Sequence, residues 1–224
     1  MFEPLAARAS LLTYMCFATI WKEPCVLKET VAATRSYRRF DERVPVPLDL
    51  LTDWVDTARL VASSANAQPL RYQIFANPED CLRIFPCIAW AGALPEWDGP
   101  EEGERPSAYI VISCHGASAV AERFTAWDEG IAAQTIMLRA NEDGFGGCMI
   151  GSFKKASLGA ICREAGGYAE GEMSPELVLA LGKPVEEVHI VSPRPDGSLK
   201  YYRDDDQVHY VPKRELGEVL VSAR

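Results

Sequence analysis

The order of apolar and polar positions predicts a mixture of helices and short strands. Between residues 48 and 62, apolar side chains recur three and four positions apart, as at Leu51, Trp54 and Ala58. This is the spacing of an amphipathic helix. Residues 108–114 are almost entirely apolar and predict a buried strand.

The longest predicted helix spans residues 126–143. Ile131, Ile136 and Met137 belong to a set of apolar side chains that leaves this helix little polar surface. A helix of this kind is buried in a core or in a subunit interface. Glycines at 144, 146 and 147 end it.

Shorter elements complete the pattern. A helix is predicted over residues 26–33 and another over 213–220. Strands are predicted at 72–76, 81–85, 177–184, 188–191, 199–202 and 208–211. Residues 92–106, rich in Gly, Pro, Glu and Asp, read as an exposed loop that could act as a lid.

Residues 1–26 differ from the rest of the chain. The apolar run at 11–21 is well short of the roughly 20 residues that span a bilayer. Arg8 precedes the run, as in a signal peptide, but no small-residue cleavage site follows. We interpret 1–26 as a helical extension or an over-long start, and 27–224 as the folded domain.

Composition limits the possible functions. The 224 residues suffice for one large domain or two small ones, and 48% are hydrophobic. The net charge of −9 argues against a general binder of nucleic acid or of anionic membranes. Seven cysteines occur without a CxxC pair or a His/Cys zinc spacing, which favours reduced thiols in a cytoplasmic protein without a metal site. Three histidines leave few candidates for a catalytic triad.

A cluster of arginines stands out in this acidic chain. Arg35, Arg38, Arg39 and Arg43 fall within a stretch of nine residues, with Ser36 between the first two. Arginine presents a fork of donors that matches phosphate oxygens, and serine adds a hydroxyl donor. The cluster could hold one phosphate group of a small cofactor. The alternative is a solvated basic turn after a helix.

Two further stretches could contact a ligand. Residues 63–69 form a polar loop of small side chains, whose amides suit a ring with alternating carbonyl and NH groups. The alternative is a helix end and a turn stopped by Pro69. Residues 148–153 could turn backbone NH groups towards a ligand, or could simply continue the core.

Together these stretches resemble the FMN-dependent nitroreductase family over about residues 27–221. The resemblance rests on Arg-Ser-Tyr-Arg-Arg-Phe at 35–40, Ser-Ser-Ala-Asn-Ala-Gln-Pro at 63–69, Asp-Glu-Gly-Ile-Ala-Ala-Gln at 128–134, Ile-Gly-Ser-Phe at 150–153, Leu-Gly-Lys-Pro at 181–184 and Tyr-Tyr-Arg-Asp at 201–204. It implies an α+β fold with a mostly antiparallel sheet wrapped by helices. It also implies an intertwined homodimer with FMN at the interface.

The resemblance also implies roles for particular residues. Arg35, Ser36 and Arg38 would hold the FMN phosphate and ribityl chain, and Arg203, with Lys200, would close the phosphate site. The loop residues would meet the flavin from the partner subunit or along the ring edge; they are Ser63, Ser64, Asn66 and Gln68. The residues beside the isoalloxazine, with a backbone NH near N5, would be Ile150, Gly151 and Ser152. Many members carry arginine where this chain has Thr34, and tryptophan where it has Leu70.

The implied activity is a ping-pong oxidoreductase. NAD(P)H would pass hydride to flavin N5, and a nitroaromatic or quinone would then accept it, with no catalytic side chain required. No Gly-x-Gly-x-x-Gly motif predicts a separate nucleotide domain. The alternatives are a same-fold flavin enzyme (dehalogenating, flavin-fragmenting or azoline-oxidising), a non-enzymatic flavin-binding or sensor protein, and an α+β domain with a surface arginine cluster.

Overall fold

The computed structural model describes residues 26–92, 94, 96–116 and 119–223. Residues 1–25 of the predicted extension lie outside the described residues. The main feature of the fold is a five-stranded sheet with the order β1-β5-β3-β2, in which β4 also pairs with β5. The strands are β1 (Phe40–Asp41), β2 (Leu70–Phe75), β3 (Ala108–His115), β4 (Gly146–Ile150) and β5 (Met173–Pro184). Every pairing in this sheet is antiparallel, which confirms the predicted α+β fold with a mostly antiparallel sheet.

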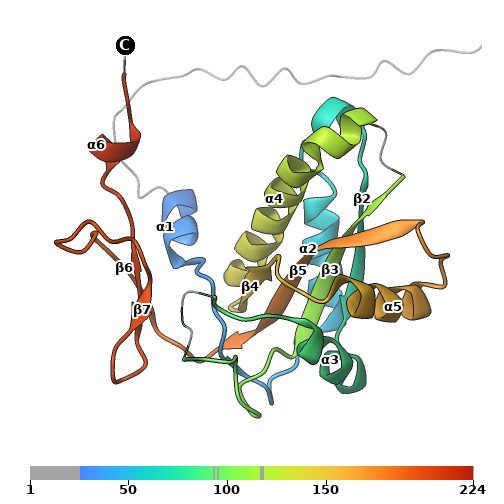
Figure 1. The fold of residues 1–224 in the computed structure, drawn as a ribbon, viewed down its shortest axis with the longest axis horizontal. Helices are drawn as coiled ribbons and strands as arrows, with labels where there is room; N and C mark the ends of the chain where they lie inside the picture. The colour runs from blue at the N-terminus through green and yellow to red at the C-terminus, as the bar shows by residue number, and fades with distance from the viewer. Residues whose placement is uncertain (1–25, 93, 95, 117–118, 224) are drawn as a thin grey trace, which may run out of the picture.

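Helices cover both faces of this sheet (Figure 1). The first core contains Tyr109 and Val111 of β3, and the second contains Ile110 and Ile112, because successive side chains of a strand point to opposite faces. The first core packs under α3 (Pro78–Ile84) and α5 (Lys155–Gly166). The second packs under α2 (Leu48–Ala58) and α4 (Ala119–Glu142).

A smaller sheet stands beside the main one, near α1 (Val26–Ala33) (Figure 1). Its order is β6-β8-β7. The strands are β6 (Val188–Val191), β7 (Tyr202–Arg203) and β8 (His209–Pro212), and α6 (Leu216–Val219) follows. The C-terminal part of the chain thus returns to the region where the described chain begins.

The predicted strand at 81–85 is wrong, because these residues belong mostly to α3. Asn77 caps this helix by accepting a hydrogen bond from the backbone N of Asp80 at 2.8 Å. Pro78 occupies the first turn, where its missing NH costs nothing. The helix predicted at 48–62 ends at Ala58, and the one predicted at 126–143 begins earlier, at Ala119.

The described residues contain neither a membrane-spanning helix nor a metal-binding cluster. No helix there combines the length and the apolar character that crossing a bilayer requires. The same part of the chain holds no group of three or more His, Cys, Asp or Glu side chains placed to bind a metal ion.

Candidate functional site

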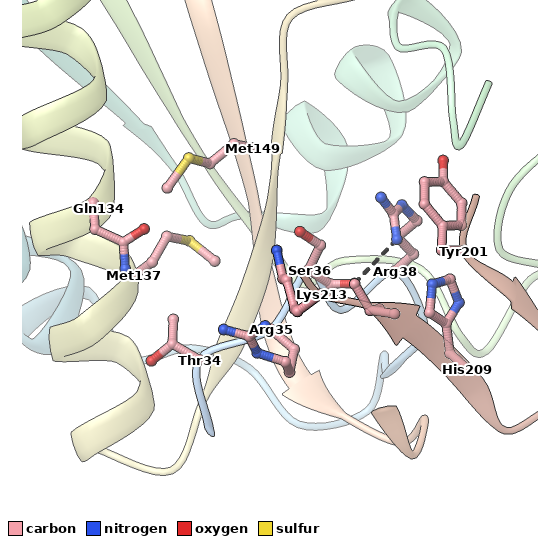
Figure 2. A pocket seen from close by; sticks show the side chains of 11 residues that line it. Thr34, Arg35, Ser36, Arg38, Gln134, Met137, Met149, Tyr201, His209 and Lys213 are labelled. Carbon is pink, nitrogen blue, oxygen red and sulfur yellow. Dashed lines mark hydrogen bonds between the residues drawn. The ribbon is translucent and has the colours of Figure 1, made fainter. Parts of the chain in front are cut away.

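A cavity of about 290 Å³ lies where the arginine cluster meets α4, β4 and the smaller sheet. Figure 2 shows its side chains converging from these elements. Its lining consists of Thr34, Arg35, Ser36, Arg38, Gln134, Met137, Met149, Tyr201, His209, Val211 and Lys213. The structure therefore brings together three of the predicted phosphate-binding residues, Arg35, Ser36 and Arg38.

Two glycines at the start of β4 hold the arginine cluster in place. Ser36 pairs with Gly147 in an isolated bridge, and the backbone N of Tyr37 donates to the Gly147 carbonyl at 2.9 Å. A Cβ on Gly147 would lie 2.3 Å from the carbonyl oxygen of Ala180, and one on Gly146 would lie 2.6 Å from the Tyr37 ring. Only residues without a side chain allow this close approach.

Arg35 has a hydrogen-bond donor that no described residue satisfies. Its Nη2 donates to the Val31 carbonyl at 2.7 Å, whereas its Nε is buried and has no hydrogen-bond partner among the described residues. Burial lowers the pKa of this guanidinium. Because an unsatisfied buried donor is costly, Arg35 is suited to receive an anionic ligand.

Arg38 is held from two sides. Its Nη1 donates to the Ser36 carbonyl at 3.2 Å, drawn as the dashed line in Figure 2, and its guanidinium carbon lies 5.2 Å from the centre of the Tyr201 ring. Its backbone N donates to the carboxylate of Glu186. These contacts fix the position of the guanidinium beside the cavity.

The charge of the lining is positive. Three cationic side chains, those of Arg35, Arg38 and Lys213, line the cavity, and no Asp or Glu among the described residues does so. In a chain of net charge −9, a group of cations without a carboxylate is suited to binding an anion. Guanidinium forks and a serine hydroxyl match the oxygens of a phosphate group.

The C-terminal wall comes from one face of β8. His209 and Val211 are two positions apart on the strand, and Lys213 is two positions further on, so the three side chains point to the same side. The predicted residues Lys200 and Arg203 do not line the cavity. Lys200 is exposed, and Arg203 forms an ion pair with Glu186 at 2.9 Å. Their assignment to the phosphate remains a prediction.

His209 is buried in this wall. Its ring centre lies 5.2 Å from that of Tyr201, and its Nδ1 has no hydrogen-bond partner among the described residues. Burial, aided by the charges of Arg38 and Arg203, lowers the pKa of His209 to about 4. The imidazole is therefore neutral near pH 7, and it can interact with a ligand without adding charge.

The loop after α2, at residues 63–69, does not line the cavity of its own chain. Ser64 donates to the buried carboxylate of Asp128 from its backbone N at 3.0 Å and from its hydroxyl at 3.1 Å. Ser63 accepts from the backbone N of Gln68 at 2.8 Å, and the Gln68 side chain donates to that of Asn66 at 3.1 Å. All four predicted loop residues thus share one hydrogen-bonded turn, which does not line the cavity.

Of the predicted ring-side residues, Ile150 is the last residue of β4, and Gly151 and Ser152 follow the strand. Met149 lines the cavity, and Ile150, the next residue, is buried at the end of the strand. Gly151 and Ser152 are exposed, and the Ser152 carbonyl accepts from the backbone N of Ala89 at 2.9 Å. These three residues continue directly from the cavity wall.

Sequence reasoning did not assign several lining residues. They are Gln134, Met137, Met149, Tyr201, His209, Val211 and Lys213. The alternation of His209, Val211 and Lys213 was a signal that could have identified the C-terminal wall. Met149 belongs to residues 148–153, which the sequence indicated could face a ligand, but no pattern singled out its side chain.

Part of this chain matches the model of a known protein family. A family model described as "Nitroreductase family" matches residues 31–183. No curated protein matches the chain.

Solved structures share the fold. One is a proposed nitroreductase from Exiguobacterium sibiricum in complex with FMN, at 20% identity and a TM-score of 0.58, covering 70% of this chain and 88% of that one. Another is a nitroreductase family protein from Streptococcus pneumoniae, at 14% identity and a TM-score of 0.60, covering 76% and 96%. A third is a proposed NADH dehydrogenase or NAD(P)H nitroreductase from Parabacteroides distasonis, at 17% identity and 0.55, covering 80% and 96%.

Proposed function

Because the chain belongs to the nitroreductase family, we propose that it is an FMN-dependent oxidoreductase that uses NAD(P)H to reduce a nitroaromatic or a quinone. The observation that carries this proposal is the cavity lined by Arg35, Ser36, Arg38 and Lys213 without a described carboxylate. Such a donor set fits the phosphate of FMN.

The side chains of this site would bind and orient rather than react. A bound FMN would supply the redox chemistry, which is hydride transfer between NAD(P)H and an acceptor. Arg35 and Arg38 neutralise the phosphate charge, and Ser36 offers a hydroxyl donor. We assign Gln134, Met149 and residues 150–152 to the flavin beyond its phosphate, since Gln134 and Met149 line the cavity and 150–152 follow Met149.

We further propose that the chain acts as a homodimer with FMN at the subunit interface. Asp128, which holds the loop after α2, and Gln134, which lines the cavity, lie six positions apart on α4. This spacing corresponds to about 9 Å along a helix and about 120° around it. The loop residues Ser63, Ser64, Asn66 and Gln68 therefore suit the cavity of a partner subunit better than that of their own chain.

Exposed apolar residues on α4 support the same proposal. The side chains of Trp127 and Ile131 are 65% and 45% exposed, and with Gln134 they follow the four- and three-residue spacing of one helix stripe. Large exposed apolar residues beside a ligand cavity favour an interface. A partner covering this stripe would also enclose the flavin.

The test begins with the visible absorption spectrum of the purified protein. The chromophore is released and identified, and then NADH and NADPH oxidation is followed with menadione or nitrofurazone as acceptor. Stoichiometric FMN with acceptor-dependent turnover supports the proposal. A colourless protein that takes up no added FMN contradicts it. Bound FMN without NAD(P)H oxidation would favour the sensor alternative.

A further inference from the structure

A second and larger cleft, of about 510 Å³, lies apart from the cavity at the arginine cluster, which is the proposed phosphate cavity. Its walls come from α3, from the loop before β3 and from the segment after β1. Tyr109 of β3 belongs to the core on this face, whereas Met137 of the phosphate cavity belongs to the other core. The two cavities therefore share no lining residue, and Tyr109 and Met137 pack on opposite faces of the sheet.

Two polar groups beside this cleft lack partners. The side chain of Tyr109 is 0% exposed, and its hydroxyl has no hydrogen-bond partner among the described residues. Arg105 is half-buried, its Nε is likewise without a partner, and its guanidinium forms no ion pair with any described residue. Leaving such donors unsatisfied is costly, and native proteins rarely do so without a reason.

The other charges of the cleft are already engaged or lie in solvent. Arg43 pairs with Asp41 at 2.9 Å. The carboxylate of Glu42 accepts from the backbone N of Gly103 at 2.6 Å. Glu102 is exposed. Arg105 is therefore the cation of this cleft that is available to a ligand.

The remaining walls are apolar and partly aromatic. The guanidinium carbon of Arg105 lies 4.5 Å from the centre of the Phe85 ring, which orients its donors. Leu82, Cys81 and Pro106 add apolar surface. A volume of this size, with apolar walls and a few convergent polar groups, is typical of small-molecule sites.

We propose that this cleft is a second ligand site, which binds a small aromatic carboxylate. The carboxylate accepts hydrogen bonds from Arg105 and from the Tyr109 hydroxyl, and the aromatic body lies against Phe85 and Leu82. A carboxylate suits the site because it only accepts hydrogen bonds and can satisfy both donors at once. This inference is independent of the flavin and goes beyond the proposed function.

The test titrates naphthoate into the protein as purified and measures the heat of binding. Naphthoate should bind at one site. Arg105→Met and Tyr109→Phe should each weaken binding about tenfold, because each removes one hydrogen bond to a charged group. Arg43→Met, at the rim of the same cleft, is the matched control and should change the affinity less than about twofold.

Three results would overturn the proposal. The first is no binding of naphthoate, or binding that neither Arg105→Met nor Tyr109→Phe weakens. The second is equal binding of the neutral naphthamide or of naphthylmethylamine, because the carboxylate would then play no part. The third is displacement of bound flavin, seen in the visible spectrum, which would place the ligand in the phosphate cavity. Arg105 lies on a loop, so its variant tests the site even if Tyr109→Phe does not fold.

Discussion

The guanidinium of Arg203 donates to the carboxylate of Glu186 at 2.9 Å, and the two side chains are only 8% and 0% exposed. The same carboxylate accepts from the backbone N of Arg38. The smaller sheet is therefore tied to the arginine cluster through one buried acid. The ring of Trp97, whose centre lies 4.3 Å from the Arg203 guanidinium carbon, covers this ion pair.

Removing one partner of this ion pair should destabilise the fold. Arg203→Met leaves the Glu186 charge buried without its cation, which should cost about 3–5 kcal/mol in the free energy of unfolding. Urea denaturation measures the change. The double variant Arg203→Met, Glu186→Gln should recover part of the loss, since no buried charge remains. Arg214→Met, which breaks the exposed pair with Glu218, is the control and should cost less than about 1 kcal/mol.

Arg35→Ala should release FMN while leaving the fold intact, because a charge-assisted phosphate contact is lost and the core is untouched. A contact of this kind contributes about 1.5–3 kcal/mol, so the dissociation constant of FMN should rise about 10- to 100-fold. Flavin fluorescence titration measures the constant. Arg43→Ala is the control, because its guanidinium pairs with Asp41 away from the cavity. Unchanged flavin affinity in Arg35→Ala would remove that residue from the site.

Lys213 should contribute to phosphate binding more than Lys200 does. Lys213 lines the cavity, whereas Lys200 does not. Lys213→Ala should therefore weaken FMN binding about tenfold, and Lys200→Ala by less than about twofold. The same fluorescence titration compares the two variants. The reverse order of effects would support the assignment of Lys200 made from the sequence.

His209 should make the stability depend on pH below neutrality. Its pKa is about 4 in the folded chain and about 6.5 when unfolded, so between these values only the unfolded chain binds the proton. Stability should therefore fall as the pH falls through this window, by about 1.4 kcal/mol per pH unit. Urea denaturation at several pH values measures the slope, and His209→Gln should remove this contribution.

The comparison with His209→Gln is needed because a second group acts in the opposite direction. Burial, together with nearby Glu176, raises the pKa of Glu129 to about 7. Its carboxyl is therefore protonated first in the folded chain, and its contribution stabilises the fold as the pH falls through that value. Only the difference in pH slope between the wild-type protein and His209→Gln isolates the contribution of His209. Identical slopes would show that the imidazole titrates normally.

Ile131→Glu should disrupt the proposed homodimer. A charge placed on the exposed stripe of α4 would have to be buried on association, which should raise the dimer dissociation constant about thirtyfold or more. Light scattering coupled to size exclusion measures the mass, and flavin content is read on the same fractions. Leu82→Glu, exposed on the other face of the sheet, is the control. A wild-type protein that is monomeric with bound FMN would count against an interface site.

Local patterns in the sequence anticipated much of the main sheet and its helices. The apolar run that forms β3 indicates a strand buried on both faces, and the periodicity of α2 indicates a helix buried on one face. Such patterns can be recognised within a single segment, without knowledge of the tertiary contacts. The error at α3 arose from the apolar residues Leu82 and Ile84, although Asn77 and Pro78 carried the signal of a helix start.

The candidate site was predictable only in part, because its walls depend on tertiary contacts. Arg35, Ser36 and Arg38 could be identified from their clustering alone. The presence of Lys213 in the cavity lining could not, because it depends on which side of the smaller sheet faces the cavity. Arg203 pairs with the buried acid Glu186, whose position also depends on the fold, and its assignment to the phosphate stays a prediction.

The cavity beside the arginine cluster takes its walls from that cluster, from α4 and β4 in the middle of the chain, and from β8 near its end. Bringing such distant segments together requires closing long loops, an entropic cost that delays the formation of non-local contacts. During synthesis, the cavity would be complete only after Lys213 has left the ribosome. We therefore expect the chain to fold before it binds the proposed FMN, which would then stabilise the finished structure by mass action.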